Sequence, residues 1–155
     1  MPDVTHWVQA QPLTTDGFAP YGQVVGLDDL QIDLRDDEVF HLNILSYEHK
    51  PIRVDHINRH HKATQALVPM GGRPAVIVVG GKDLTFDTID DLAKLQAFIL
   101  DGTRGINLAL GTWHEGPLPL MERVDLLNLQ GKHFENDNEV AYFERDLGAV
   151  VGVRL

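Results

Sequence analysis

Cysteine is absent from the 155 residues of the chain. This absence excludes disulfide bonds, thiolate zinc sites and a cysteine nucleophile. Basic residues are also scarce: 13 Lys and Arg stand against 23 Asp and Glu, and the formal net charge is −10. Nucleic acids and anionic membranes require clustered Lys and Arg, so the composition argues against both as partners. A small anionic substrate remains compatible with this charge if a few cationic groups converge in one pocket.

Long apolar runs are missing as well. No stretch approaches the ~20 apolar residues needed to span a bilayer. The opening MPDVTHWVQAQPLTTDG has no basic region followed by an apolar run, so we expect no signal peptide and a cytoplasmic location. The apolar content of 43% and the mean hydropathy of −0.14 are ordinary for a globular protein. The length predicts one domain covering residues 1–155.

Short apolar or alternating runs separated by Gly, Pro, Asp and Asn predict about ten strands. These runs are QVVGL, EVFHLNILSY, PIRVDHI, TQALVPM, AVIVVG, QAFIL, GINLAL, VDLLNL, EVAYFE and AVVGVRL. Two short helices are expected, one over residues 14–20 and one directly after Asp87 or Thr88. Many strands with so little helix favour a mainly β sandwich or barrel over a parallel α/β sheet.

Histidines cluster in the segment HINRHHKATQALVPM, which holds His56, His60 and His61. Alternate side chains of an extended strand share a face, so His56, Asn58 and His60 are expected to point one way. Arg59 and His61 are then expected to point the other way. Imidazole nitrogens with an amide oxygen suit nickel, zinc, manganese or iron. Taken alone, the segment is equally compatible with a polar strand face in water.

A second segment, GINLALGTWHEGPLPL, predicts a strand, a tight turn and a return strand that carries a histidine. Together the two segments have the spacing Asn58-x-His60-x4-Gln65-x6-Gly72 and Gly105-x5-Gly111-x2-His114. This spacing resembles the two motifs of the cupin superfamily. The resemblance implies a cupin-like double-stranded β-helix barrel in which His60, Gln65 and His114 look inward and bind one metal ion. Asn58 occupies the position of the first motif histidine, and Gln65 occupies that of the glutamate.

A narrower resemblance spans roughly residues 13–138. The blocks FAPYGQVVG, RHHKATQALVPMGGRPAVIVV, LQAFILDGTRGINLALGTWHEGPL and VDLLNL are similar to the ureidoglycolate lyase family. Its enzymes are small cupin-like dimers of allantoin breakdown. The resemblance implies cleavage of ureidoglycolate to glyoxylate and urea, a homodimer, and a divalent metal, with nickel suggested. It also implies that His114, His60 and Gln65 are both the catalytic residues and the metal ligands.

The chain departs from the family pattern at two places. The family usually has Glu where Asn58 precedes Arg-His, and an amide is a weaker ligand that cannot act as a base. Residues 108–110 are Leu-Ala-Leu, where the family tends to carry Tyr and His before Trp-His. Either departure is compatible with a different substrate. Glu115 has two interpretations, as a replacement for the lost charge or as a solvated loop residue.

The substrate carboxylate is expected to contact Arg59 and Arg73 in a fork geometry, with Asn58 and Trp113 also binding substrate. Each arginine is equally compatible with a surface ion pair, and Trp113 with a place in the core. The run Asn136 to Glu139 predicts a turn, and the similar Asp/Asn cluster that the family carries there implies substrate contact as a second interpretation. Two alternative functions stay open: a divergent cupin enzyme acting on another small hydroxy or keto acid, and a non-catalytic cupin that binds a small molecule.

Overall fold

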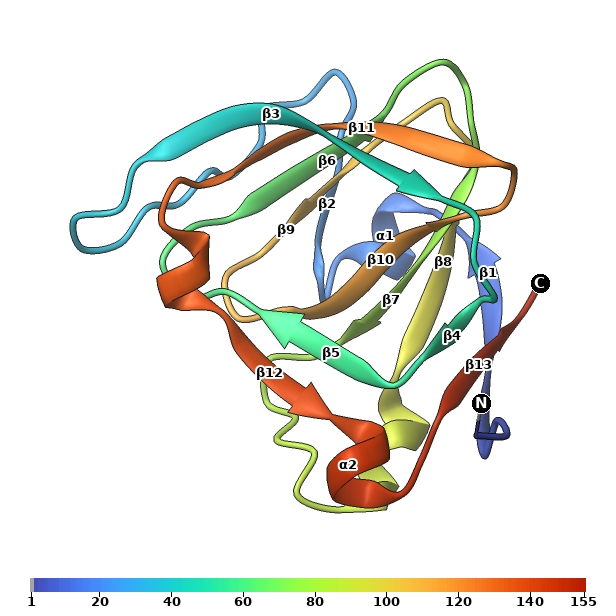
Figure 1. The fold of residues 1–155 in the computed structure, drawn as a ribbon. Helices are drawn as coiled ribbons and strands as arrows, with labels where there is room; N and C mark the ends of the chain where they lie inside the picture. Colours follow the sequence, from blue (N-terminus) through green and yellow to red (C-terminus); the bar gives the residue numbers. More distant parts are fainter. Residues whose placement is uncertain (1) are drawn as a thin grey trace.

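The computed structural model describes residues 2–155 and is built mainly from β-strands (Figure 1). The first strands along the chain are β1 His6–Pro12, β2 Gly22–Val24, β3 Phe40–Glu48, β4 Arg53–Val54, β5 His56–Arg59, β6 Gln65–Pro69 and β7 Ala75–Gly80. The later strands are β8 Gln96–Leu100, β9 Ile106–Leu108, β10 Trp113–Pro119, β11 Arg123–Gly131, β12 Glu139–Tyr142 and β13 Val151–Arg154. The helical segments are α1 Thr15–Phe18, α2 Phe143–Leu147 and the 3-10 turns η1 Ile89–Lys94 and η2 Phe134–Asp137. No helix within residues 2–155 is long and apolar enough to cross a membrane.

The strands form two sheets that curve around a shared interior (Figure 1). One sheet has the order β12-β5-β10-β7-β8-β1-β13-β4, and the other has the order β2-β9-β6-β11-β3. This is a cupin-like β barrel, as the sequence resemblance implied. The arrangement places β5 and β10 in one sheet and β6 and β11 in the other, so residues far apart in the sequence face a common space.

Two apolar clusters hold the sheets in place. One lies between the sheets and joins Leu67 and Leu126 of the five-stranded sheet to Ile77 and Phe98 of the eight-stranded sheet. The other lies on the opposite face of β7 and is covered by α2 and by the segment that leads into η1. All six residues of β7 are therefore buried. This explains why AVIVVG is a continuous apolar run instead of an alternating one.

Gly105, directly before β9, shows why the second motif begins with glycine. A Cβ built at this position would lie 2.5 Å from the Leu67 carbonyl oxygen and 2.8 Å from Val68 Cα. Both contacts are with the backbone of β6, which cannot move aside as a flexible side chain can. The close approach of β9 to β6 thus depends on the missing side chain.

The local predictions were largely confirmed, with differences at the ends of elements. The first predicted helix is shorter than expected, and Thr14 caps it by accepting a hydrogen bond from the Gly17 amide at 3.0 Å. The second predicted helix is a 3-10 turn. EVAYFE was predicted as one strand, but only its first four residues are extended. Phe143 is buried in the second cluster and its amide binds the Asp55 carbonyl, which turns the chain into α2. The strand β1 was not predicted.

Candidate active site

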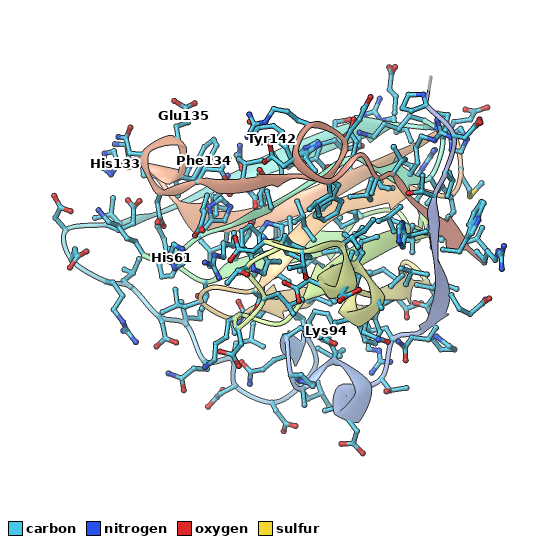
Figure 2. The ribbon with its side chains drawn as sticks, turned by 90° about the horizontal axis from the view of Figure 1, so that it is seen from below. His61, Lys94, His133, Phe134, Glu135 and Tyr142 are labelled. Carbon is cyan, nitrogen blue, oxygen red and sulfur yellow. The ribbon has the colours of Figure 1, made fainter. Side chains whose placement is uncertain are left out.

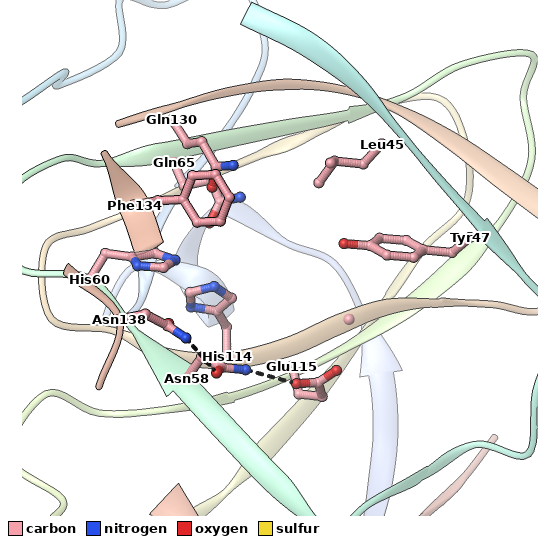
Figure 3. A pocket seen from close by; sticks show the side chains of 11 residues that line it. Leu45, Tyr47, Asn58, His60, Gln65, His114, Glu115, Gln130, Phe134 and Asn138 are labelled. Atoms are coloured by element: carbon pink, nitrogen blue, oxygen red, sulfur yellow. Dashed lines mark hydrogen bonds between the residues drawn. The ribbon is translucent and has the colours of Figure 1, made fainter. Parts of the chain in front are cut away.

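A pocket of about 240 Å³ opens in the interior, between the inner faces of the two sheets (Figure 3). Its walls come from β3, β5, β6, β10, β11 and η2, and its lining residues are Leu45, Tyr47, Asn58, His60, Gln65, His114, Glu115, Gly116, Gln130, Phe134 and Asn138. The structure therefore brings together four of the predicted site residues: Asn58, His60, Gln65 and His114. The size suits a small metabolite, because pockets for drug-sized ligands begin at about 300 Å³.

His60 and His114 form the centre of the pocket. The Cα atoms of His114 on β10 and Asn58 on β5 are register partners, and the two imidazole centroids lie 5.3 Å apart. His60 Nδ1 lies 3.1 Å from the Asp137 carbonyl oxygen, and His114 Nδ1 lies 3.1 Å from the Thr112 carbonyl oxygen. A carbonyl oxygen only accepts hydrogen bonds, so each Nδ1 carries the hydrogen and donates it. In the neutral ring the lone pair is then on Nε2.

Both histidines are held in the neutral form. Burial lowers the pKa of His60. Burial, and then repulsion from a charged His60, lowers the pKa of His114 to about 4. At neutral pH each ring therefore has one Nε2 lone pair that can bind a metal ion or accept a proton. A neighbouring carbonyl that fixes the tautomer is also the usual support of a metal-binding histidine.

Gln65 is oriented by a chain of side-chain amides across three strands, in which Gln65 and Asn128 are buried and Asn43 is exposed. Gln65 Nε2 donates to Asn128 Oδ1 at 2.9 Å, and Asn128 Nδ2 donates to Asn43 Oδ1 at 2.8 Å. This chain leaves Gln65 Oε1 buried and without a hydrogen-bond partner among the described residues. An unpaired buried acceptor is costly. Its position at the pocket wall makes Gln65 Oε1 a ready contact for a ligand.

Glu115 also lines the pocket, although it directly follows His114 on β10. Strand alternation would turn it to the opposite face. The pairing of β10 with β7 shifts register between Glu115 and Leu118. This shift lies after Glu115, and the contacts of the Glu115 side chain are what place its carboxylate at the pocket. Glu115 Oε2 accepts a hydrogen bond from Asn58 Nδ2 at 3.0 Å and lies 3.1 Å from His56 Nε2. Figure 3 shows Asn138 joined to Asn58, and Asn58 joined to Glu115, along the floor of the pocket.

His56 is the charged partner of this carboxylate. Its hydrogen bond with Glu115 raises the pKa of His56 to about 9, burial opposes the rise, and a hydrogen bond with Asp55 adds to it. His56 Nδ1 lies 2.6 Å from Asp55 Oδ1. At neutral pH His56 is therefore protonated. It supports Glu115 from beside the pocket and is not one of the lining residues.

Arg59 and Trp113, both predicted to bind substrate, lie outside the pocket lining. The Arg59 guanidinium donates to both carboxylate oxygens of Glu139, at 2.7 and 3.1 Å, and stacks 4.2 Å above the Trp113 ring. Trp113 is 2% exposed and its Nε1 donates to the Leu84 carbonyl, so the ring is part of the core.

Arg73 and His61 also lie away from the pocket lining. Arg73 is an exposed residue in the loop between β6 and β7. His61 points away from the pocket to Glu139, with a distance of 2.7 Å to its carboxylate, as strand alternation predicted. Figure 2 shows His61 at the same end of the molecule as the η2 residues Phe134 and Glu135.

Residues 33–149 match the family described as ureidoglycolate lyase. This chain belongs to the ureidoglycolate lyase family. A ureidoglycolate lyase of Pseudomonas syringae is 28% identical, and the match covers 88% of this chain and 89% of that protein. A ureidoglycolate lyase of Brucella anthropi is 28% identical over 86% of this chain and 88% of its own. A ureidoglycolate lyase of Burkholderia mallei is 30% identical, and the match covers 76% of this chain and 78% of that protein.

The donor set of this ureidoglycolate lyase family member fits a divalent metal through neutral ligands alone. His60 Nε2, His114 Nε2 and the unpaired Gln65 Oε1 are two nitrogens and one oxygen, which suit a borderline ion. No group of three or more His, Asp or Glu able to hold a metal occurs within residues 2–155. The set therefore lacks an anionic ligand.

Several lining residues of this family member were not identified from the sequence. Asn128 supports the pocket and Gln130 lines it; both belong to the run VDLLNLQG, where polar residues at alternate positions share a face with Val124 and Leu126. Buried amides on an otherwise apolar strand face are a signal that would have found them. Tyr47 and Phe134 carry no comparable signal, because their place at the pocket depends on how β3 and η2 fold over it.

Proposed function

We propose that this chain is an enzyme that cleaves ureidoglycolate to glyoxylate and urea. The observation that carries the proposal is the match of residues 33–149 to the ureidoglycolate lyase family. The site supports it with a small pocket, two neutral imidazoles and amide groups suited to a compact polar substrate. The homologues named ureidoglycolate lyase extend over most of the chain.

The reaction requires one proton to leave an oxygen and one to reach a nitrogen. A single carbon of the substrate bears a hydroxyl, a carboxylate and the urea nitrogen. When the hydroxyl loses its proton, its oxygen forms the carbonyl of glyoxylate and the C–N bond breaks, with the electron pair moving to nitrogen. Protonation of that nitrogen completes urea. We assign both transfers to the pair His60 and His114: an Nε2 lone pair accepts the hydroxyl proton, and the imidazolium so formed donates that proton to the departing nitrogen. Positioned groups of this kind typically add about 10²–10⁴-fold to the rate.

We also propose that His60, His114 and Gln65 can hold a divalent ion, with nickel the ion suggested by the family resemblance. When bound, the ion would lower the pKa of the substrate hydroxyl and attract its carboxylate. A charge argument supports this. Among the described residues no Lys or Arg lines the pocket, and the Glu115 charge is balanced by His56. An anionic substrate therefore finds no unbalanced cationic side chain in the pocket wall.

The test follows glyoxylate release from ureidoglycolate by metal-stripped protein and by protein reloaded with nickel. Each preparation is compared with a His114→Ala variant. We expect the wild-type chain to release glyoxylate from ureidoglycolate and the His114→Ala variant to lose this activity. An Nε2 bound to a metal no longer accepts a proton, so turnover restored only by nickel assigns the histidines to metal binding. Equal turnover in both preparations assigns them to proton transfer.

Absence of glyoxylate from both preparations of folded protein would overturn the proposal. A carboxylate ligand that raises the melting temperature without turnover would then point to a binding protein. Turnover of another hydroxy or keto acid would instead point to a divergent enzyme.

We further propose that the chain acts as a homodimer in the cytoplasm, a location that the lack of cysteine fits. The outer face of the five-stranded sheet offers a contact surface. Register pairs align two cross-strand rows on it: Leu42, Leu129 and Ala66, and then Ile44, Leu127 and Val68. We call these six residues the apolar sheet face. Leu42 is 62% exposed and Ile44 is 55% exposed, whereas the solvent face of an antiparallel sheet is normally polar. A two-fold pair of such faces would cover both.

A further inference from the structure

Glu115 is the one carboxylate among the residues that line the pocket, and the proposed proton transfers do not use it. Its side chain is 16% exposed. Both of its close polar contacts, with Asn58 Nδ2 and His56 Nε2, involve Oε2. Within residues 2–155, Oε1 has no hydrogen-bond partner. A fixed carboxylate thus presents one unused acceptor at the floor of the pocket (Figure 3).

The two ends of ureidoglycolate differ in hydrogen-bonding character. One end is a carboxylate, which only accepts hydrogen bonds and is negatively charged. The other is a ureido group, whose N–H groups donate and whose carbonyl accepts. Glu115 also only accepts and carries the same charge as the substrate carboxylate, so it cannot serve that end. It is complementary to the ureido end.

His60, His114 and Gln65, which also line the pocket, suit the other part of the substrate. None of these three side chains carries a negative charge; their free Nε2 and Oε1 atoms accept a hydrogen bond from the substrate hydroxyl, and the divalent ion proposed above would attract the carboxylate. The substrate carbon that bears the hydroxyl and carboxylate therefore lies by these residues, and the ureido group extends to the floor. Asn138 Nδ2, which lies 3.3 Å from Asn58 Oδ1, is a donor at the same end for the ureido carbonyl.

We propose that Glu115 accepts hydrogen bonds from the ureido N–H groups and thereby sets the preference of the pocket for a ureido over an acyl group. This rests on the proposed lyase function. Asn58 and His56 are positioning residues, because their two bonds to Oε2 hold the carboxylate in one orientation. In this role the Asn58 amide orients Glu115 and does not need to bind a metal.

The comparison compound is N-acetyl-2-hydroxyglycine, in which a methyl group replaces the terminal amino group of the ureido end. It keeps the hydroxyl, the carboxylate and the breaking C–N bond, and it releases glyoxylate in the same assay. Hydrogen bonds to a charged acceptor predict that the wild-type chain prefers ureidoglycolate by about 10–100-fold in kcat/KM. The difference is expected mainly in KM, because the ureido end does not react at its terminal nitrogen.

Glu115→Gln keeps the shape of the side chain and removes its charge. We expect it to reduce the preference by about 10-fold through a higher KM for ureidoglycolate, with little change for the acetyl compound. Glu122→Gln, in the exposed turn before β11, is the matched control and should keep the full preference. Asn58→Ala removes the N–H that orients the carboxylate and should reduce the preference partly. Melting curves establish that each variant is folded.

The outcomes separate this inference from the lyase assignment. If the wild-type chain cleaves neither compound, the proposed function fails and this inference fails with it. If the chain cleaves both with equal kcat/KM, the inference fails alone. It is also overturned if Glu115→Gln keeps the full preference, or loses both activities equally while folded, since either result rules out a recognition role. Should Glu115→Gln not fold, an unchanged preference in Asn58→Ala overturns it.

Discussion

The imidazoles of His60 and His114 lie next to each other in the pocket, with ring centroids 5.3 Å apart. Each ring is fixed from behind by a backbone carbonyl, Asp137 for His60 and Thr112 for His114. Two backbone acceptors thus set the same tautomer in both rings and direct both Nε2 lone pairs to the pocket. The candidate chemistry of the site depends on this pair more than on any charged side chain.

His60→Ala should reduce glyoxylate release from ureidoglycolate by about 10²–10⁴-fold, because it removes one of the two lone pairs. His61→Ala is the matched control: it changes the neighbouring residue, which contacts Glu139 outside the pocket. We expect this control to keep most of the wild-type kcat. Equal losses in the two variants would show that the segment matters for folding and not through His60 itself.

Asn128→Ala should both destabilise the protein and reduce its activity. The substitution leaves Gln65 Nε2 without its acceptor and frees the amide to turn its oxygen away from the pocket. An unpaired buried donor costs about 1–3 kcal/mol of unfolding free energy, measurable by urea denaturation. Asn136→Ala, on the exposed η2 turn, provides the control for loss of an asparagine. Unchanged stability and turnover in Asn128→Ala would contradict the role given to the amide chain.

Stability should fall on the alkaline side as His56 loses its proton. The ordinary pKa of 6.5 rises to about 9 in the folded chain, because His56 hydrogen-bonds Glu115 and, against burial, also Asp55. The folded state therefore binds this proton more tightly than the unfolded state does. The resulting stabilisation is complete below about pH 6.5 and is lost as the pH rises through about 9.

Melting temperatures measured between pH 6 and 10 should decrease over this window in the wild-type chain. His56→Asn should flatten the decrease, because the titrating group has been removed. His6→Asn, on β1 and remote from the pocket, should leave the curve unchanged. If the melting temperature of His56→Asn falls with pH as much as that of the wild-type chain, a group other than His56 causes the decrease.

Ile44→Lys should dissociate the proposed dimer, because it places a charge in the middle of the apolar sheet face. Light scattering coupled to size exclusion would report a mass near that of one chain for the variant and of two for the wild type. Ile89→Lys is the control, since Ile89 is similarly exposed, at 44%, but lies on η1. A wild-type chain that remains a monomer at all concentrations would rule out the dimer.

The strand pattern was readable from the sequence because it depends on local periodicity. AVIVVG and QAFIL became β7 and β8 with the bounds that their apolar runs predicted. The helix after β12 was not readable, since the alternation of EVAYFE and its Val, Tyr and Phe residues favour a strand. Burial of Phe143 against Phe86, in the apolar cluster that also holds Trp113, turned the chain, and such tertiary packing overrides propensity.

The sequence by itself determined the barrel class, the family, and the motif spacing that places His60, Gln65 and His114 at one pocket. Only the tertiary structure decided which charged residues reach that pocket. Arg59 is held by Glu139, 80 positions away in the sequence, and Glu115 is held at the pocket by Asn58 and His56 of β5. Motif spacing and alternation are properties of the linear sequence, so they are visible in it. Ion pairs and side-chain hydrogen bonds between strands exist only once the sheets have formed.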